Sequence, residues 1–222
     1  MKKISCIVIL LFMYFNSHSQ SAYSSQTWLQ DNTGKLIMSN SYTDVDGSPY
    51  LPIHWIEGSV QLKTGKIIQY NALRLNLING HLEFQLNDKS YDVVNAIDEF
   101  NLGAMKFRNG FEGIDRQNKD TFYQVLYDGK QKILCYRIGV IYLDAPYNSA
   151  TKTKKIDLTE KYYLQKTDGK LYPFKKNLKE LLSLVGDKSS QVNDFCKKEN
   201  LKLRNWDEAV KVLEYVDTLG EN

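Results

Sequence analysis

The sequence has few of the side chains from which catalytic and metal centres are usually built. Its 222 residues include only three histidines and three cysteines, and no two cysteines form a C-x-x-C pair. The nucleophile motif G-x-S-x-G, the phosphate-binding P-loop and the glycine motif of dinucleotide-binding folds are all missing. We therefore expect no zinc site, no thioredoxin-type redox centre and no bound cofactor.

Proline and long apolar runs are scarce as well. The chain has four prolines against 15 tyrosines, a composition that favours strands over long disordered linkers. Beyond the N-terminus, no segment approaches the roughly 18 uninterrupted apolar residues that a membrane-spanning helix needs. We therefore expect no transmembrane segment once the N-terminus has been processed.

The first 19 residues have the pattern of a secretory signal peptide. Lys2 and Lys3 precede the apolar run Ile4–Phe15, and the small residues Ser17 and Ser19 follow it. At a rise of about 1.5 Å per residue this run covers about 18 Å of a hydrocarbon core about 30 Å thick, which argues against a membrane anchor. We predict cleavage after Ser19 and export to the periplasm, the outer membrane or the extracellular space.

Charge is nearly balanced once the predicted signal peptide has been removed. The whole chain carries 29 basic and 26 acidic residues, and the loss of Lys2 and Lys3 leaves 27 against 26. Duplex-binding domains concentrate basic residues on one face, whereas acids and bases are interspersed here. The sequence therefore argues against nucleic acid as a partner.

Turn sequences divide the middle of the chain into short strand-like segments. Asn79-Gly80 separates Ala72–Ile78 from His81–Leu86 at the spacing of a tight type I′ hairpin. Apolar residues alternate along both segments, and their phase shifts near Asn71–Ala72, which predicts a bulge there. Further turns are predicted at Thr64-Gly65, Asn87-Asp88, Asn109-Gly110, Asp128-Gly129 and Asp168-Gly169.

From Ile133 to Tyr142 one face of the predicted strand is wholly apolar or aromatic and the other is partly so, and we therefore expect a central strand that is covered on both sides. Strand patterns extend from about Gly58 to Leu143 and resume at Lys161–Phe174. Between them, residues 144–160 are expected to form a long exposed loop.

Helical spacing replaces alternation after Pro173. Asn177 is a predicted N-cap and Gly186 a predicted stop for the first helix, and Asn205 with Glu208 forms the signature of a capping box for the last. Apolar residues at helical spacing are Leu178, Leu181, Leu182 and Val185; Val192, Phe195 and Cys196; and Trp206, Ala209, Val210, Leu213 and Val216.

Together these patterns predict a mainly β (α+β) protein. We expect an antiparallel β meander that forms a sandwich or a partly open barrel and is covered by about three short C-terminal helices. The expected divisions are a signal peptide (1–19), an N-terminal extension (20–57), the β domain (58–176) and a helical tail packed on it (177–222).

The chain resembles a family of uncharacterised exported proteins of Gram-negative bacteria. The resemblance rests on the signal peptide and on three segments, Gly58–Leu86, Phe122–Leu143 and Lys161–Leu219. It implies a β-rich envelope protein with a helical tail. It implies no activity and supplies no catalytic residues.

Few residues are candidates for a functional site. Asp44 and Asp46, next to Gly47, form the nearest approach to a calcium loop, but the twelfth position of such a loop holds Trp55 instead of glutamate. An Asx-type turn is the alternative. Asp98 with Glu99, or Glu112 with Asp115, could form the paired acids of a glycosidase, which depends on a distance that sequence does not give.

Histidines and cysteines give no stronger candidate. His81 follows a turn and is expected at the surface, whereas His54 is expected to be a packed or hydrogen-bonded structural residue. Cys135 and Cys196 remain after processing, and we favour two buried, unpaired thiols over a disulfide.

Two functions remain open at this point. The first is a non-catalytic exported envelope protein, a binding or structural module whose partner is an unknown envelope protein or glycan. The alternative is a hydrolase-type enzyme with a site assembled from scattered carboxylates and His54.

Overall fold

The computed structural model describes residues 42–94, 96–145 and 152–220. The predicted signal peptide and most of the predicted N-terminal extension lie outside these residues. Strands account for 46% of the described residues and helices for 19%, which confirms a mainly β protein with three C-terminal helices. The strands are β1 (Val45–Asp46), β2 (Tyr50–Leu62), β3 (Ile67–Asn76), β4 (Leu82–Leu86), β5 (Lys89–Asp92), β6 (Ile97–Leu102), β7 (Met105–Arg108), β8 (Tyr123–Asp128), β9 (Lys132–Asp144), β10 (Thr153–Gln165) and β11 (Leu171–Pro173).

All of these strands belong to one sheet with the order β1-β10-β9-β8-β7-β6-β2-β3-β4-β5, and β11 also pairs with β10. It consists of two antiparallel meanders, β2 to β5 and β6 to β10, which are joined where β6 pairs with β2. The pairing of β1 with β10 is parallel. The sheet is not closed into a barrel.

Turn chemistry places most strand ends where the sequence predicts them. The chain turns between strands at Gly65 and at Gly169, both with positive φ, and at Asn87-Asp88. The hairpin at Asn79-Gly80 exists, but its loop is longer than the predicted two residues, because β3 ends at Asn76 and β4 begins at Leu82. The Asn76 N–H donates to the carbonyl of His81 and closes this wider loop.

The predicted bulge in β3 is present. Ile56 is paired with Leu73 and Gly58 with Tyr70, so that Asn71 and Ala72 together oppose a single residue of β2. As a result Leu73 is buried in the same core cluster against which Tyr70 packs.

The three helices are α1 (Leu178–Leu184), α2 (Ser189–Lys198) and α3 (Trp206–Thr218). The Asn177 side chain accepts hydrogen bonds from the first turn of α1, and that of Asn205 accepts one from Glu208 N at 2.8 Å, as predicted. The Glu208 carboxylate, however, accepts from the N–H groups of Lys202 and Arg204 instead of closing the capping box at Asn205.

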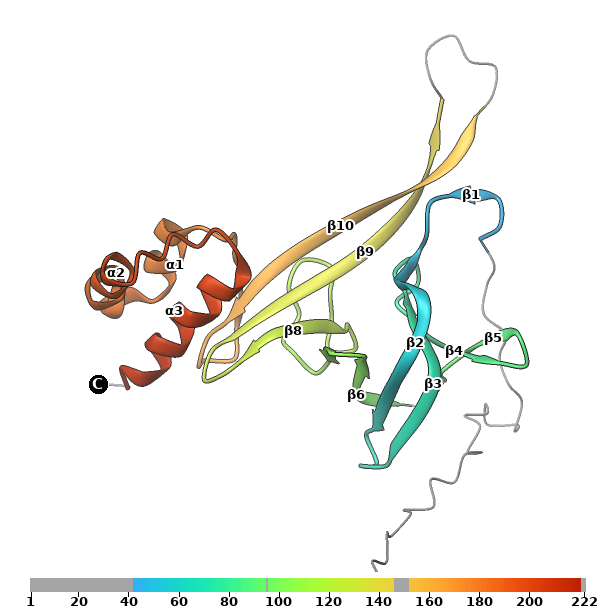
Figure 1. Ribbon diagram of the computed structural model, residues 1–222, viewed down its shortest axis with the longest axis horizontal. Coiled ribbons are helices and arrows are strands. Elements are labelled where there is room, and N and C mark those ends of the chain that lie inside the picture. Colours follow the sequence, from blue (N-terminus) through green and yellow to red (C-terminus); the bar gives the residue numbers. More distant parts are fainter. Residues whose placement is uncertain (1–41, 95, 146–151, 221–222) are drawn as a thin grey trace, which may run out of the picture.

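Helices and sheet share one apolar cluster. Ile133 of β9, Leu164 of β10 and Phe174 lie in it, together with the helical residues Leu181, Val185, Val192, Cys196, Ala209, Val212, Leu213 and Val216. The helices therefore gather at one end of the β9–β10 hairpin (Figure 1).

Strands β9 and β10 form a hairpin that extends from the helices past β1 (Figure 1). They are paired over their whole length, from Lys132 with Gln165 to Asp144 with Thr153. The expectation of a loop over residues 144–160 is therefore wrong for residues 153–160, which are strand. The tip, residues 146–151, lies outside the described residues.

Candidate functional site

The outer part of this hairpin is a two-stranded arm, defined here as residues 136–144 of β9 and 153–161 of β10. Strand β8 pairs with β9 only as far as Cys135, so no described strand flanks the arm on its β9 side. On the other side β1 pairs with β10 only at Lys154 and Lys155. The β10 edge of the arm is therefore open over most of its length, and the β9 edge is open beyond Gly139, whose N–H donates to the Leu77 carbonyl.

Large apolar side chains are exposed on the arm. Val140 is 54% exposed, Tyr142 46% and Leu143 62%, and Leu158 on the neighbouring strand is 50% exposed. Because consecutive residues of a strand point to opposite faces, exposure from Val140 through Leu143 means that both faces are uncovered. The expectation that this strand is covered on both sides holds at Ile133 and Leu134, which are fully buried, and is wrong from Val140 to Leu143.

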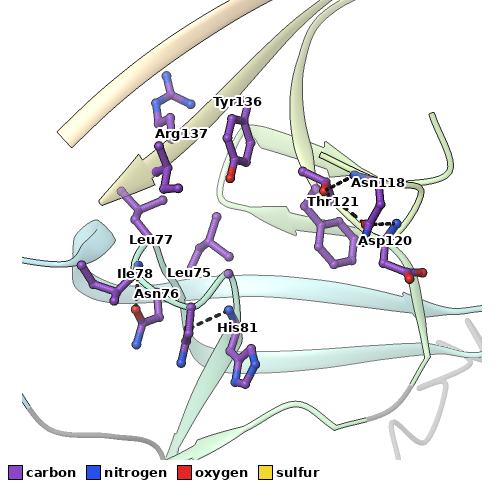
Figure 2. Close-up of a pocket in the computed structure, with 14 residues that line it drawn as sticks. Leu75, Asn76, Leu77, Ile78, His81, Asn118, Asp120, Thr121, Tyr136 and Arg137 are labelled. Atoms are coloured by element: carbon purple, nitrogen blue, oxygen red, sulfur yellow. Dashed lines mark hydrogen bonds between the residues drawn. The ribbon is translucent and has the colours of Figure 1, made fainter. Parts of the chain in front are cut away.

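A cavity of about 330 Å³ lies where the β3–β4 loop, residues 118–122 and β9 come together (Figure 2). The hydroxyl of Tyr136 points toward its middle, whereas the guanidinium of Arg137 and the ring of His81 point away from it (Figure 2). Several of its polar side chains already have partners. Asn76 donates to Glu83 Oε1 at 2.9 Å, and Arg137 donates to Glu160 at 2.7 Å.

Among the described residues, the histidine–carboxylate pair near this cavity lies outside it. His81 Nδ1 lies 2.7 Å from Asp92 Oδ2, and the imidazole is 54% exposed, in agreement with the predicted surface position. No described nucleophile shares a hydrogen bond with this ring. The cavity therefore lacks the convergent acid, base and nucleophile of a hydrolytic centre.

His54 is not the packed or hydrogen-bonded residue that the sequence suggested. It is exposed in β2, within an irregular stretch between Leu51 and Ile56 where the register with β3 shifts. Among the described residues it has no hydrogen bond or ion pair to a carboxylate, and it lines neither hollow described in this section. The structure thus brings no scattered carboxylate to His54.

A second hollow, which we call the Trp206 hollow, lies between β10, the residues after β11 and the start of α3. It has a volume of about 470 Å³, and its walls include Trp206, Tyr162 and Phe174. The rings of Trp206 and Tyr162 have centroids 4.2 Å apart, and those of Trp206 and Phe174 are 6.0 Å apart. Lys175 and Lys176 form part of its rim.

The carboxylates beside the Trp206 hollow are engaged in other contacts. Glu160 bonds Arg137 and the Tyr162 hydroxyl, and these bonds hold the pKa of Glu160 below its usual range. Burial, together with the bond to Glu160, raises the pKa of Tyr162. Asp115 accepts from Lys161 Nζ and from the Tyr163 hydroxyl, each at 3.2 Å.

The other candidate residues are not brought together. Asp44 is exposed and bonds Lys154, and Asp46 is exposed in β1; no group of three or more potential metal ligands occurs among the described residues. Glu99 bonds Lys106 at 3.0 Å and Arg108 at 3.1 Å.

Cys135 and Cys196 are both buried and unpaired, as the sequence analysis favoured. Burial raises the pKa of the Cys135 thiol to about 11, and that of Cys196 is raised for the same reason. Neither thiol is therefore activated as a nucleophile.

Sequence reasoning missed the arm and the Trp206 hollow. The run from Val140 to Leu143 is compatible with either a buried or a projecting strand, and only the end of β8 pairing at Cys135 decides between them. The walls of the hollow come from four separate segments, so no local sequence pattern predicts it.

Comparison with known proteins gives no further assignment. No family model, no curated protein and no solved structure matches the chain. No helix of the described residues is long and apolar enough to cross a membrane.

Proposed function

We propose that this protein is a non-catalytic, exported protein of the cell envelope that binds another protein through its β9–β10 arm. The observation that carries this proposal is the exposure of Val140, Ile141, Tyr142 and Leu143 on a two-stranded arm with open edges. Contiguous apolar patches and unpaired strand edges are features that proteins normally cover or use for binding.

Electrostatics at the arm supports a specific contact rather than unspecific adhesion. Ion pairs flank the apolar residues: Lys155 lies 2.6 Å from Asp144, and Arg137 lies 2.7 Å from Glu160. An apolar centre with a charged rim is the usual anatomy of a protein interface. The export half of the proposal rests on the sequence pattern of residues 1–19.

The hydrolase alternative has less support. His54 has no described carboxylate partner, and no described hydroxyl or thiol in the cavity beside His81 is hydrogen-bonded to its ring. No observation favours a reaction class, so binding is the function that the geometry supports best.

Site-specific photocrosslinking tests the proposal. A photoreactive residue in place of Leu143, introduced in the bacterium that produces the protein, should give a discrete crosslinked product. The same residue in place of Lys198, which is exposed on α2, should give none. The substitutions Val140→Thr and Tyr142→Thr keep residues of high strand propensity in the strand and should abolish the product.

An arm that yields no crosslink, or a product that survives both threonine substitutions, would refute binding through the arm. Export is tested separately by N-terminal sequencing of the envelope fraction, which should begin at Gln20. A protein that retains Met1 would refute export.

A further inference from the structure

The outer edge of β10 has a short open stretch that ends at the Trp206 hollow. Toward the tip, β1 pairs with Lys154 and Lys155. Toward the helices, β11 pairs with Tyr163, Leu164 and Gln165. No described strand pairs with residues 156–162 on this side, and these residues are called the β10 notch below.

Apart from the Tyr162 carbonyl, the backbone groups of the notch that face outward have no described partner. The carbonyl of Tyr162 accepts from Phe174 N on this outer side at 2.8 Å. Because successive residues of an antiparallel strand direct their N–H and C=O groups alternately to the two sides, Glu160 and Leu158 point to the same outer side as Tyr162. Residues 157–161 are all exposed, so a further strand would have access to these groups.

The notch is closed at its helical end. The hydrogen bond from Phe174 and the pairing of β11 occupy the position that an added strand would otherwise continue into. A chain that runs along the notch toward Tyr162 must therefore end or turn at the Trp206 hollow.

The side chains around the Trp206 hollow are suited to bind the C-terminal residue of a peptide. Trp206, Tyr162 and Phe174 provide an aromatic wall for an apolar side chain. The ammonium group of Lys176 lies 5.5 Å from the Trp206 ring centroid, and that of Lys175 has no ion pair with a described residue. Asp115 and Glu160 already have cationic partners. The Glu180 carboxylate, which accepts from the Lys175 backbone N–H at 3.1 Å, offsets one of the two lysine charges, so the rim keeps a net positive charge.

We propose that the β10 notch and the Trp206 hollow together bind the C-terminal segment of another polypeptide. The segment adds to β10 as a parallel strand through the outward groups of Leu158 and Glu160. Its last side chain, apolar or aromatic, enters the hollow, and its terminal carboxylate meets Lys175 and Lys176. Strand addition with capture of a chain end is a general mode of peptide recognition. The notch overlaps the β10 strand of the arm and includes Leu158, but the site does not use Val140, Ile141, Tyr142 or Leu143, on which the proposed function rests.

Binding of a synthetic peptide to the full mature chain tests the proposal. The probe is an acetylated heptapeptide of alternating threonine and valine that ends in phenylalanine with a free carboxylate. Its partner probe is the same peptide with a C-terminal amide. Fluorescence anisotropy of labelled peptides should show at least about tenfold tighter binding of the free acid, which corresponds to about 1.4 kcal/mol.

Two pairs of variants test separately the addition of the peptide as a strand and the binding of its terminal carboxylate. Leu158→Pro removes an outward N–H without removing a hydrogen bond to β9, and should weaken the free acid at least about tenfold, whereas Leu158→Ala keeps the N–H and should bind normally. Lys175→Ala with Lys176→Ala should reduce binding of the acid to that of the amide. Lys197→Ala with Lys198→Ala, an exposed pair on α2, should change nothing.

Equal binding of acid and amide, or normal binding by the Leu158→Pro variant, would overturn the proposal. So would a lack of binding at millimolar peptide. An oligogalacturonate that binds where the peptide does not would assign the hollow to an acidic glycan instead. Thermal unfolding of each variant excludes misfolding as the cause. If Leu158→Pro is unstable, the lysine pairs and the comparison of acid with amide still test the proposal.

Discussion

The backbone N–H of Gly139 donates a hydrogen bond of 2.8 Å to the carbonyl oxygen of Leu77. These residues come from opposite halves of the sheet, since β9 and β3 are separated by β8, β7, β6 and β2 in the strand order. The Leu77 N–H in turn donates to the carbonyl of Pro49 at 2.8 Å. The β3–β4 loop thus links the base of the arm to the far half of a sheet that does not close.

A side chain at position 139 should disturb this link. A Cβ there would lie 3.0 Å from Ile78 Cδ1 and 3.2 Å from Leu158 Cδ2. We expect Gly139→Val to destabilise the protein by about 1–3 kcal/mol. Removing the opposing side chain with Ile78→Ala should recover part of this loss, which a double-mutant cycle by denaturant unfolding measures. Strictly additive losses would contradict a direct contact.

The second prediction concerns a buried ion pair. Arg74 donates to Glu83 Oε2 at 2.8 and 3.0 Å, and its guanidinium lies between the rings of Tyr50 and Trp55, with centroids 3.3 and 3.9 Å away. The Glu83 side chain is fully buried. Arg74→Met should therefore cost about 3–5 kcal/mol in unfolding free energy, because it leaves a buried carboxylate without its cation.

Removing both charges should cost less than removing one. The Arg74→Met, Glu83→Leu double variant leaves no unpaired charge and should be more stable than Arg74→Met alone. Lys197→Met, which breaks an exposed pair with Asp194, should change stability by less than about 0.5 kcal/mol. A double variant that is less stable than Arg74→Met would contradict this interpretation.

The third prediction concerns alkaline pH. Burial raises the pKa of Cys135 to about 11, so the folded state holds the proton more tightly than the unfolded chain does, with a pKa of about 8.5. The stability that this provides is complete below about pH 8.5 and decreases as the pH rises toward 11. Cys135→Ala should therefore lose less unfolding free energy than the native protein between these values.

Thiol reactivity provides an independent check. At pH 8 neither Cys135 nor Cys196 should react with Ellman's reagent in the folded protein, and both should react in guanidinium chloride. Rapid modification of the folded protein would show that the thiols are not buried.

Local patterns predicted the elements that local forces determine. Asn177 and Asn205 cap helices because their side-chain oxygens satisfy backbone donors a few residues away. The bulge at Asn71–Ala72 was predictable because the apolar phase must shift to keep one face in the core. Both features depend on neighbouring residues alone.

The features that the sequence did not predict depend on pairing between strands that are far apart in the chain. The pairing of β6 with β2, which splits the expected single meander into two, leaves no local trace. Likewise residues 153–160 are rich in charged side chains, which favoured the prediction of a loop, but their pairing with β9 makes them part of a strand. The Trp206 hollow is also a long-range feature, because Tyr162 and Trp206 meet only when α3 packs on β10.

The fourth prediction tests the packing of α3. Leu213 is fully buried in the cluster that contains Ile133 and Leu164. Leu213→Ala should cost about 2–5 kcal/mol in unfolding free energy, because it leaves a cavity in that cluster. Lys211→Ala, at an exposed position of the same helix, should have little effect. Equal effects of the two substitutions would show that α3 is not packed as described.

The last prediction is that residues 177–220 fold as part of the β domain. Ile133 and Leu164 are fully buried under the helices, and the Tyr127 hydroxyl donates to Asp217 at 2.8 Å. Truncation after Lys176 would expose this surface, and each large apolar side chain that loses its cover costs about 1.5–3 kcal/mol out of a typical total of about 5–15 kcal/mol. The truncated protein should therefore unfold at a much lower denaturant concentration than the full chain, or aggregate. If it keeps the full-length midpoint, the helices are an independent appendage, and the apolar stripe of α3 becomes a binding surface in its own right.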